Sequence, residues 1–385
     1  MLILEHDAKS ILAAEGVRVP SGTLAATADA PPPDFPGPWF VKAQVPAGGR
    51  GKAGGIVRAE TPDEMKAALA RLLGSRLKGH PVRECRIEAA VGDAAEAYFS
   101  LSVDPRSGRV IVLLSAEGGV EIESEAGRAG LRADLCRRDS GAIAAAAAKL
   151  AEKLPDPAGL ALADAGEILG ELFCRLEATQ IEINPLLVHA DGSWTAGDAK
   201  VIVDEAAFPR QELFARLVRD RAHAYPEAAL KLEQDFDYVE LDPDGEIGLV
   251  TTGAGLSMQL IDEMLEAGVR PYNFCDIRSG TFRGSPARLI WTMQQIAKGR
   301  SVRAVLVNIF AGVTHLGELA GLLLQAREAV PELDVPVIVR LVGNGLDEAK
   351  EILAASDAAF TLETDLEQAV RRCAEALAAS KGKSR

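Results

Sequence analysis

The sequence is poor in cysteine, in positive charge and in long apolar runs, and each shortage excludes a class of protein. The five cysteines are odd in number and form no CxxC pair, so we expect reduced thiols and no disulfide framework. A net charge of −14 argues against nucleic acid as the main partner, because the phosphate backbone requires a basic protein face. No uninterrupted apolar run reaches the ~18 residues that a membrane-spanning helix needs.

The start of the chain and its length indicate where the protein works and how it is divided. Met1–Leu4 is followed at once by Glu5, too early for the apolar core of a secretory leader, so we expect a cytoplasmic protein. A chain of 385 residues fits two or three domains. The turn sequence of residues 242–245, DPDG, predicts a boundary between a domain of residues 1–240 and one of residues 241–385.

A glycine-rich stretch with two cations follows a predicted strand near the N-terminus. The strand ends around Val45, and residues 48–55 contain five glycines together with Arg50 and Lys52. Glycine lets backbone N–H groups approach phosphate oxygens, and the cations supply charge, as does Lys42 on the strand. The pattern predicts a flexible flap over a triphosphate. A glycine-rich hairpin with solvated charges is the alternative.

A second motif, residues 181–201, predicts a hairpin with oxygen ligands on one face. With the turn centred on Asp191, residues whose numbers sum to about 382 lie opposite each other, which pairs Asn184 with Asp198. Glu182 shares the face of Asn184, because strand side chains alternate. Three such oxygens suit Mg²⁺, which prefers a few protein oxygens together with waters and phosphates. A hairpin with a merely solvated polar face is the alternative.

Beyond residue 245 the pattern changes to alternating strands and helices. Apolar strands such as residues 304–309 are typical of a parallel sheet covered on both faces, so we expect a flavodoxin-like, doubly wound domain. Glycines follow the predicted strands near Thr252, Gly280 and Gly312, where helix N-termini would create anion sites.

Seven segments, in this order across almost the entire chain, resemble the β subunit of the succinyl-CoA synthetase family of ADP- or GDP-forming acid–CoA ligases. They are VKAQVPAGGRGKAGG, AEGGVEIE, IEINPL, GDAKV, TTGAGLSM, VLVNIFAG and VPVIVRLVGN. The resemblance implies an ATP-grasp fold for about residues 1–240, followed by a flavodoxin-like CoA-ligase domain. It also implies ATP, Mg²⁺ and CoA as cofactors and co-substrate, and a partner α subunit that supplies a phosphorylated histidine.

The resemblance assigns roles to individual residues. The implied nucleotide contacts are Lys42, Gly49, Arg50, Gly51, Glu88 and Glu96; the implied metal ligands are Asn184 and Asp198; the implied substrate contacts are Thr252, Gly312, Val313 and Thr314. Glu182 resembles the catalytic carboxylate that orients the partner's phosphohistidine. We also expect Glu88 and Glu96 to lie near the mouth of one hairpin, formed by residues 97–103 and 109–114. His315 is expected to be a polar or interface residue and no second phosphate acceptor.

The chain departs from the family where the acid substrate would bind. Thr252 replaces a usual asparagine, and two arginines, Arg278 and Arg283, enter a loop that is normally free of cations. These arginines could bind an additional substrate carboxylate, or they could make contacts across the subunit interface. Succinate is the expected acid, with malate or another dicarboxylate as the alternative. A non-catalytic subunit that binds nucleotide or CoA and regulates a partner is the competing hypothesis.

Overall fold

The computed structural model describes residues 1–119, 130–278, 284–312, 314–356 and 360–383, with side chains placed as far as residue 380. Contacts divide the chain into two compact units, Met1–Glu212 and Leu213–Arg385. This division lies earlier than the expected boundary at 240/241. Within the segment concerned, β14 (Asp237–Glu240) belongs to the second unit because it pairs with β16 (Asn273–Asp276).

The first unit contains two antiparallel sheets. The larger one has the order β1-β13-β11-β8-β9-β10, with β12 beside β11, and the smaller one has the order β2-β7-β3-β4. The strands of the larger sheet are β1 (Leu2–Ile3), β8 (Ala95–Val103), β9 (Val110–Ser115), β10 (Arg132–Cys136), β11 (Ala178–Val188), β12 (Trp194–Ala196) and β13 (Lys200–Val203). Those of the smaller sheet are β2 (Gly22–Ala25), β3 (Trp39–Ala43), β4 (Ile56–Ala59) and β7 (Cys85–Ala89), and β5 (Arg76–Leu77) pairs with β6 (His80–Pro81).

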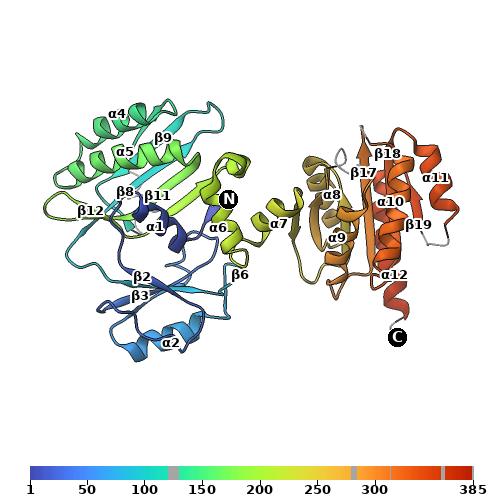
Figure 1. Ribbon diagram of the computed structural model, residues 1–385, viewed down its shortest axis with the longest axis horizontal. Helices are drawn as coiled ribbons and strands as arrows, with labels where there is room; N and C mark the ends of the chain where they lie inside the picture. Colours follow the sequence, from blue (N-terminus) through green and yellow to red (C-terminus); the bar gives the residue numbers. More distant parts are fainter. Residues whose placement is uncertain (120–129, 279–283, 313, 357–359, 384–385) are drawn as a thin grey trace. The chain divides into compact units, whose positions relative to one another are not determined.

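Helices cover both sheets of this unit, and one short helix contacts both sheets. α4 (Ser140–Ala151) and α5 (Ala158–Arg175) lie side by side on the larger sheet, and α2 (Pro62–Leu72) packs on the smaller one (Figure 1). α1 (Glu5–Ala14) contacts β13 of the larger sheet and β2 of the smaller one. α1 therefore brings its side chains to the space between the two sheets.

Local sequence explains why these elements form where they do. α2 begins at Pro62, because the hydroxyl of Thr61 accepts a hydrogen bond from Glu64 N–H and proline is favoured in the first turn. α5 approaches α4 closely through small residues: a Cβ at Gly170 would lie 2.8 Å from Ile143 Cγ2. Val17 N–H caps α1 by binding Leu12 O, and the paired strand begins only at Gly22.

The second unit is built on the predicted parallel sheet. Its hydrogen-bonded order is β15-β17-β18-β19, and a parallel bridge joins Ile247 of β15 to Pro271, just before β16. In chain order its further elements are α6 (Glu212–Asp220), α7 (Pro226–Gln234), β15 (Ile247–Thr251), α8 (Ala254–Glu266), α9 (Ala287–Ala297), β17 (Ala304–Ala311), α10 (Leu316–Ala329), β18 (Val337–Gly343), α11 (Leu346–Ala354), β19 (Phe360–Glu363) and α12 (Leu366–Lys383); the six-residue 3₁₀ helix η2 (Glu205–Arg210) precedes α6 in the chain. With β16 beside β15, the strand order is the flavodoxin-like one that the sequence predicted.

Both faces of this parallel sheet are buried, which explains its continuously apolar strands. Along β17, Val305 and Val307 pack with residues of α9, α10 and α11, whereas Ala304 and Leu306 pack with residues of α8 and α12. Alternating side chains thus meet helices on opposite faces (Figure 1).

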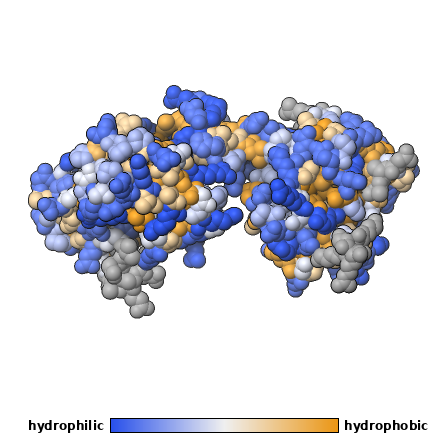
Figure 2. All heavy atoms as spheres, turned by 90° about the horizontal axis from the view of Figure 1, so that it is seen from below, coloured by the Kyte–Doolittle hydropathy of each residue, from blue (hydrophilic) through white to orange (hydrophobic). Residues whose placement is uncertain are grey.

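The face of the molecule drawn in Figure 2 is mainly polar. Hydrophilic side chains cover most of the face drawn in Figure 2, and hydrophobic ones lie between them in small groups. The large exposed hydrophobic side chains of the described residues include Met258 on α8 and Phe310 at the end of β17. Of the helices in the described ranges, none is long and apolar enough to cross a membrane.

Candidate active site

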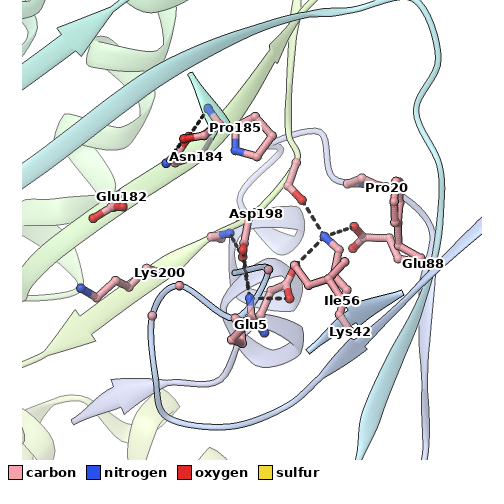
Figure 3. Close-up of a pocket in the computed structure, with 18 of the residues that line it drawn as sticks. Glu5, Pro20, Lys42, Ile56, Glu88, Glu182, Asn184, Pro185, Asp198 and Lys200 are labelled. Carbon is pink, nitrogen blue, oxygen red and sulfur yellow. Dashed lines mark hydrogen bonds and ion pairs between the residues drawn. The ribbon is translucent and has the colours of Figure 1, made fainter. Parts of the chain in front are cut away.

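A cavity of about 370 Å³ lies within the first unit, between its two sheets. Both sheets, α1 and the glycine-rich flap contribute to its wall (Figure 3). All the site residues predicted in this half line it: Lys42, Gly49, Arg50, Gly51, Glu88, Glu96, Glu182, Asn184 and Asp198. Its volume lies in the usual range for a small-molecule site, about 300–1,000 Å³. The fold therefore brings together residues that are up to 156 positions apart in the sequence.

Helix α1 adds two charged residues that the sequence analysis missed. Lys9 is fully buried, and its ammonium lies 2.9 Å from Glu5 Oε1, 2.6 Å from Glu88 Oε2 and 2.8 Å from the carbonyl oxygen of Gly197. Glu5 and Lys9 are four residues apart, so they share one face of the helix. That spacing was visible in the sequence, but nothing local indicated that the pair would be buried.

Lys42, the predicted phosphate contact on β3, has all three ammonium N–H groups engaged. Its Nζ lies 2.9 Å from Glu5 Oε1, 2.6 Å from Glu88 Oε1 and 2.9 Å from Gly197 O. Burial opposes its charge, but Glu5 and Glu88 outweigh burial and raise the pKa of Lys42. Lys42 is therefore a fixed cation whose partners are internal carboxylates.

Arg50, the predicted phosphate contact of the flap, is likewise paired. Its Nη2 donates to both carboxylate oxygens of Asp198, at 3.0 and 2.9 Å, and lies 2.8 Å from Glu5 Oε2. The contact with Glu5 is an ion pair without hydrogen-bond geometry. Gly49, with φ of +64°, turns the chain just before Arg50. A nucleotide phosphate would have to compete with Asp198 and Glu5 for this guanidinium.

Glu88 lies elsewhere than expected. It is on β7 of the smaller sheet and only 2% exposed, so it does not lie on the β8–β9 hairpin with Glu96, as the sequence had suggested. Arg86, two residues earlier on the same strand face, binds it through Nε at 2.6 Å. Burial raises the pKa of Glu5 and of Glu88, but the surrounding cations, Lys42 and Lys9 foremost, outweigh burial, so both pKa values are lowered.

We call Glu5, Lys9, Lys42, Arg50, Arg86, Glu88 and Asp198 the charge network. It joins four cations to three carboxylates through the ion pairs given above. Sequence reasoning found Lys42, Arg50, Glu88 and Asp198, and missed the other three.

The predicted register of the second motif is confirmed on both sides of its centre. Leu186 pairs with Ala196, and Glu182 pairs with Lys200, so each pair sums to 382 as expected. Between β12 and β13 the ladder is interrupted at residues 197–199, where Asp198 turns to Arg50. The amide of Asn184 instead exchanges two hydrogen bonds with the backbone of Gly119, at 2.6 and 3.2 Å.

The donor set of Asn184 and Asp198 fits Mg²⁺. Asn184 Oδ1 accepts one hydrogen bond, from Gly119, and Asp198 Oδ2 accepts one, from Arg50. Each oxygen retains a lone pair, because a carbonyl or carboxylate oxygen has two. Mg²⁺ characteristically takes one or two protein oxygens and completes its shell with water and phosphate. In the part of the chain that the structure describes, no three His, Cys, Asp or Glu side chains gather to hold a metal ion.

The predicted substrate residues lie in the second unit, at the carboxyl ends of its strands. Thr252 follows β15, is 3% exposed, and its hydroxyl has no hydrogen-bond partner among the described residues. Gly312 follows β17, and Val313 lies outside the described residues. Thr314 precedes His315, the residue just before α10, whose Nδ1 lies 3.9 Å from Glu348 Oε2.

Arg278, one of the two arginines that distinguish the substrate loop, has a partner within its own unit. Its Nη1 donates to Asp235 Oδ1 at 3.1 Å, and its φ of +57° is unusual for a side chain with a Cβ. The sequence analysis had weighed a substrate carboxylate against a subunit interface and had not considered an internal carboxylate. Arg283 lies outside the described residues.

Comparison with known proteins agrees with this geometry. A model of the ATP-grasp domain matches residues 2–188, and a model of the CoA-ligase family matches residues 250–374. The chain is 37% identical to the succinate–CoA ligase [ADP-forming] subunit beta of Rubrobacter xylanophilus, over 97% of this chain and 98% of that protein. It is 36% identical to the protein of the same name from Halobacterium salinarum, with the same shares covered. The chain belongs to the family of ADP-forming succinate–CoA ligase β subunits.

Membership in this family confirms the predicted fold and the predicted enzyme class, an ADP-forming acid–CoA ligase. The fold is also shared with ATP citrate lyase from Methanothrix soehngenii, solved in complex with citrate and coenzyme A. That structure is 15% identical, with a TM-score of 0.68, and the match covers 97% of this chain and 92% of that one. At this identity the likeness concerns the fold alone.

Proposed function

We propose that the chain is the catalytic β subunit of an ADP-forming succinate–CoA ligase and that it works with an α subunit bearing a phosphorylated histidine. The observation that supports this most is the single cavity that combines the flap cations with Glu182, Asn184 and Asp198. ATP binds there and phosphorylates the partner's histidine. The phosphoryl group then activates the acid, and CoA displaces phosphate from the acyl phosphate. We place the complex in the cytoplasm.

The chain's own residues bind and orient, since phosphoryl transfer needs positioning and charge neutralisation more than covalent help. The N–H groups of the flap around Gly49 and Gly51, together with Lys42 and Arg50, hold the nucleotide phosphates. Glu88 fixes Lys42 in place, and Glu96 lies on the nucleotide side of the cavity. Asn184 and Asp198 hold Mg²⁺, which neutralises phosphate charge when bound.

Glu182 acts on the partner's histidine. It faces the cavity from β11, and its Oε2 accepts a hydrogen bond from Gln180 at 3.0 Å, which restricts its rotamers. A carboxylate so placed accepts a hydrogen bond from one imidazole nitrogen and leaves the other for the phosphoryl group.

Succinate is the proposed acid, and Thr252, Gly312, Val313 and Thr314 are proposed to contact the bound substrate in the second unit. The pairing of Arg278 with Asp235 supports succinate over malate or another substituted dicarboxylate, because it engages one of the two arginines that could bind an additional group. The alternative is a subunit that binds nucleotide or CoA and regulates its partner without turnover.

The deciding experiment is phosphate transfer from γ-labelled ATP to a co-expressed α-type partner in the presence of Mg²⁺, followed by a chase with CoA and a panel of dicarboxylic acids. Label on the partner's histidine that succinate plus CoA removes is the expected result. If a different acid plus CoA removed the label, that acid would be the substrate. A correctly assembled complex that carried no label would favour the regulatory alternative.

A matched pair of variants refines this test. Glu182→Gln should lower partner phosphorylation by about 10²-fold, the usual effect of removing one positioned catalytic group. Glu167→Gln, an exposed change on α5, should leave it unchanged. Equal phosphorylation by both variants would remove Glu182 from the mechanism.

A further inference from the structure

One cation of the cavity, Lys200, differs from Lys42 and Arg50 in that no described carboxylate is bound to it. It lines the cavity at the start of β13 and is half-buried. Across the described ranges, its ammonium makes neither a hydrogen bond nor an ion pair (Figure 3). Lys42 and Arg50, by contrast, are bound by three carboxylates of the charge network.

The position of Lys200 is fixed by the sheet. It pairs directly with Glu182 across the antiparallel β11–β13 ladder, so the two side chains project on the same face. Directly opposite residues have Cβ atoms about 5 Å apart. The spare positive charge therefore lies beside the carboxylate that is proposed to meet the phosphohistidine.

A phosphoryl group beside Glu182 needs a nearby cation to balance its charge. A phosphoryl group that arrives beside Glu182 brings negative charge next to a carboxylate, which is unfavourable unless a cation compensates for it. Lys42 has no ammonium donor left for that group in its present contacts, because all three of its N–H groups are engaged. Lys200 can supply that cation, since its three donors have no described acceptor.

We propose that Lys200 is a phosphoryl-contacting residue of the transfer reaction, in addition to Lys42 and Arg50. Its ligand is a phosphoryl group: either the terminal phosphate of the nucleotide or the phosphoryl group on the partner's histidine. The proposal rests on the proposed function, because it assumes that phosphate moves through this cavity.

The test uses the complete complex of this chain with its α partner and compares Lys200→Met, Lys200→Arg and the control Lys66→Met. Lys66 is an exposed residue of α2 that does not line the cavity. We expect Lys200→Met to slow partner phosphorylation by about 10²–10³-fold, as for the loss of one preorganised donor to a transferring group. Lys200→Arg should restore part of the rate, because it keeps the charge, and Lys66→Met should match the wild type.

Binding measurements distinguish the two sources of the phosphoryl group without depending on turnover. If Lys200 contacts the nucleotide, Lys200→Met weakens binding of a non-hydrolysable ATP analogue by at least tenfold and leaves ADP binding unchanged. If it contacts the phosphohistidine, both affinities stay the same, and phosphoryl return from the labelled partner to ADP slows by the factor seen in the forward direction.

Failure of this inference and failure of the proposed function would give different results. Wild-type rates in Lys200→Met, together with unchanged affinities, would overturn the inference while leaving the proposed function intact. An unlabelled wild-type complex would instead overturn the proposed function, and the ATP-analogue titration would still test whether Lys200 contacts a nucleotide phosphate. Thermal unfolding of each variant verifies that the first unit is folded.

Discussion

The two units of this chain bury polar groups in different ways. Every buried charged residue of the described chain lies in the first unit: Glu5, Asp7, Lys9, Lys42, Arg50, Arg86 and Glu88. The buried polar residues of the second unit are neutral: Thr251, Thr252, Ser257, Asn273, Thr292 and Asn308. The first unit thus holds fixed charges before any ligand arrives, whereas the second places hydroxyls and amides at the ends of an apolar sheet.

The difference follows from what surrounds each site. In the first unit, helix α1 and two antiparallel sheets converge on one point, so cations and carboxylates from several elements can satisfy one another. In the second unit, the parallel sheet is covered by helices on both faces, and an unpaired charge there would have to be buried in an apolar layer at high cost. A charged ligand is therefore bound most favourably inside the first unit or at the sheet edge of the second unit.

Removing a carboxylate from the charge network should have the largest effect on stability. Glu88→Gln leaves Lys9, Lys42 and Arg86 short of one negative charge, and we expect a loss of about 3–5 kcal/mol in unfolding free energy, as for a broken buried ion pair. Lys9→Met should cost less, because it leaves three cations facing three carboxylates. Urea denaturation, followed by the fluorescence of Trp39 and Trp194, measures both changes.

The matched change in the second unit is Glu367→Gln, which breaks an exposed ion pair with Arg371 on α12. Its expected cost is at most about 0.5 kcal/mol, since exposed pairs contribute little. If Glu88→Gln cost no more than this control, the charge network would not stabilise the first unit.

Asn273 is a buried neutral residue of the second unit, and its removal can be compared with the removal of a charge from the first unit. Its side-chain amide donates to Leu249 O and accepts from Leu249 N–H, both at 2.8 Å. The side chain thus takes the place of backbone hydrogen bonds between β16 and β15. Asn273→Ala would leave two buried backbone groups of Leu249 unpaired, at a cost of about 2–4 kcal/mol. A loss below about 1 kcal/mol in urea denaturation would mean that water or a shifted strand replaces the amide.

As the pH falls, the first unit should lose stability before the second unit does. The pKa values of Glu5 and Glu88 are lowered from the usual 4.5, so the unfolded chain binds protons more readily than the folded one. The stabilisation is therefore complete above that pH and is lost as pH falls through the lower folded values. Each unit of pKa difference corresponds to about 1.4 kcal/mol.

Single-tryptophan variants separate the two responses, since Trp194 lies in the first unit and Trp291 in the second. As the pH falls below about 5, the urea midpoint reported by Trp194 should fall more than that reported by Trp291. Parallel decreases at both positions would show that acid acts on both units alike.

Thr252→Val should have the smallest effect on stability. The buried hydroxyl has no described partner, so replacing it with a methyl group should leave the unfolding free energy unchanged or raise it by up to about 1 kcal/mol. If Thr252 contacts the acid as proposed, KM for succinate should nevertheless rise while partner phosphorylation by ATP stays the same. An unchanged KM would remove Thr252 from the substrate site.

The sequence by itself determined the elements that depend on local periodicity. The alternation of strands and helices beyond residue 245 is confirmed, and the apolar strands predicted the parallel sheet because both of its faces are covered. The pairing of residues whose numbers sum to 382 followed from one turn at Asp191, since the turn of a hairpin fixes which residues pair. That same sum places Lys200 opposite Glu182, a consequence that the sequence analysis did not draw.

Only the tertiary structure decided which charges meet. Glu5 and Lys9 are ordinary residues of an amphipathic helix in sequence, and they become the partners of Lys42, Glu88 and Arg50 because α1 contacts both sheets. The same holds for Arg278, whose partner Asp235 lies 43 residues away. Ion pairs over such separations depend on how the elements pack, and neither composition nor periodicity specifies that packing.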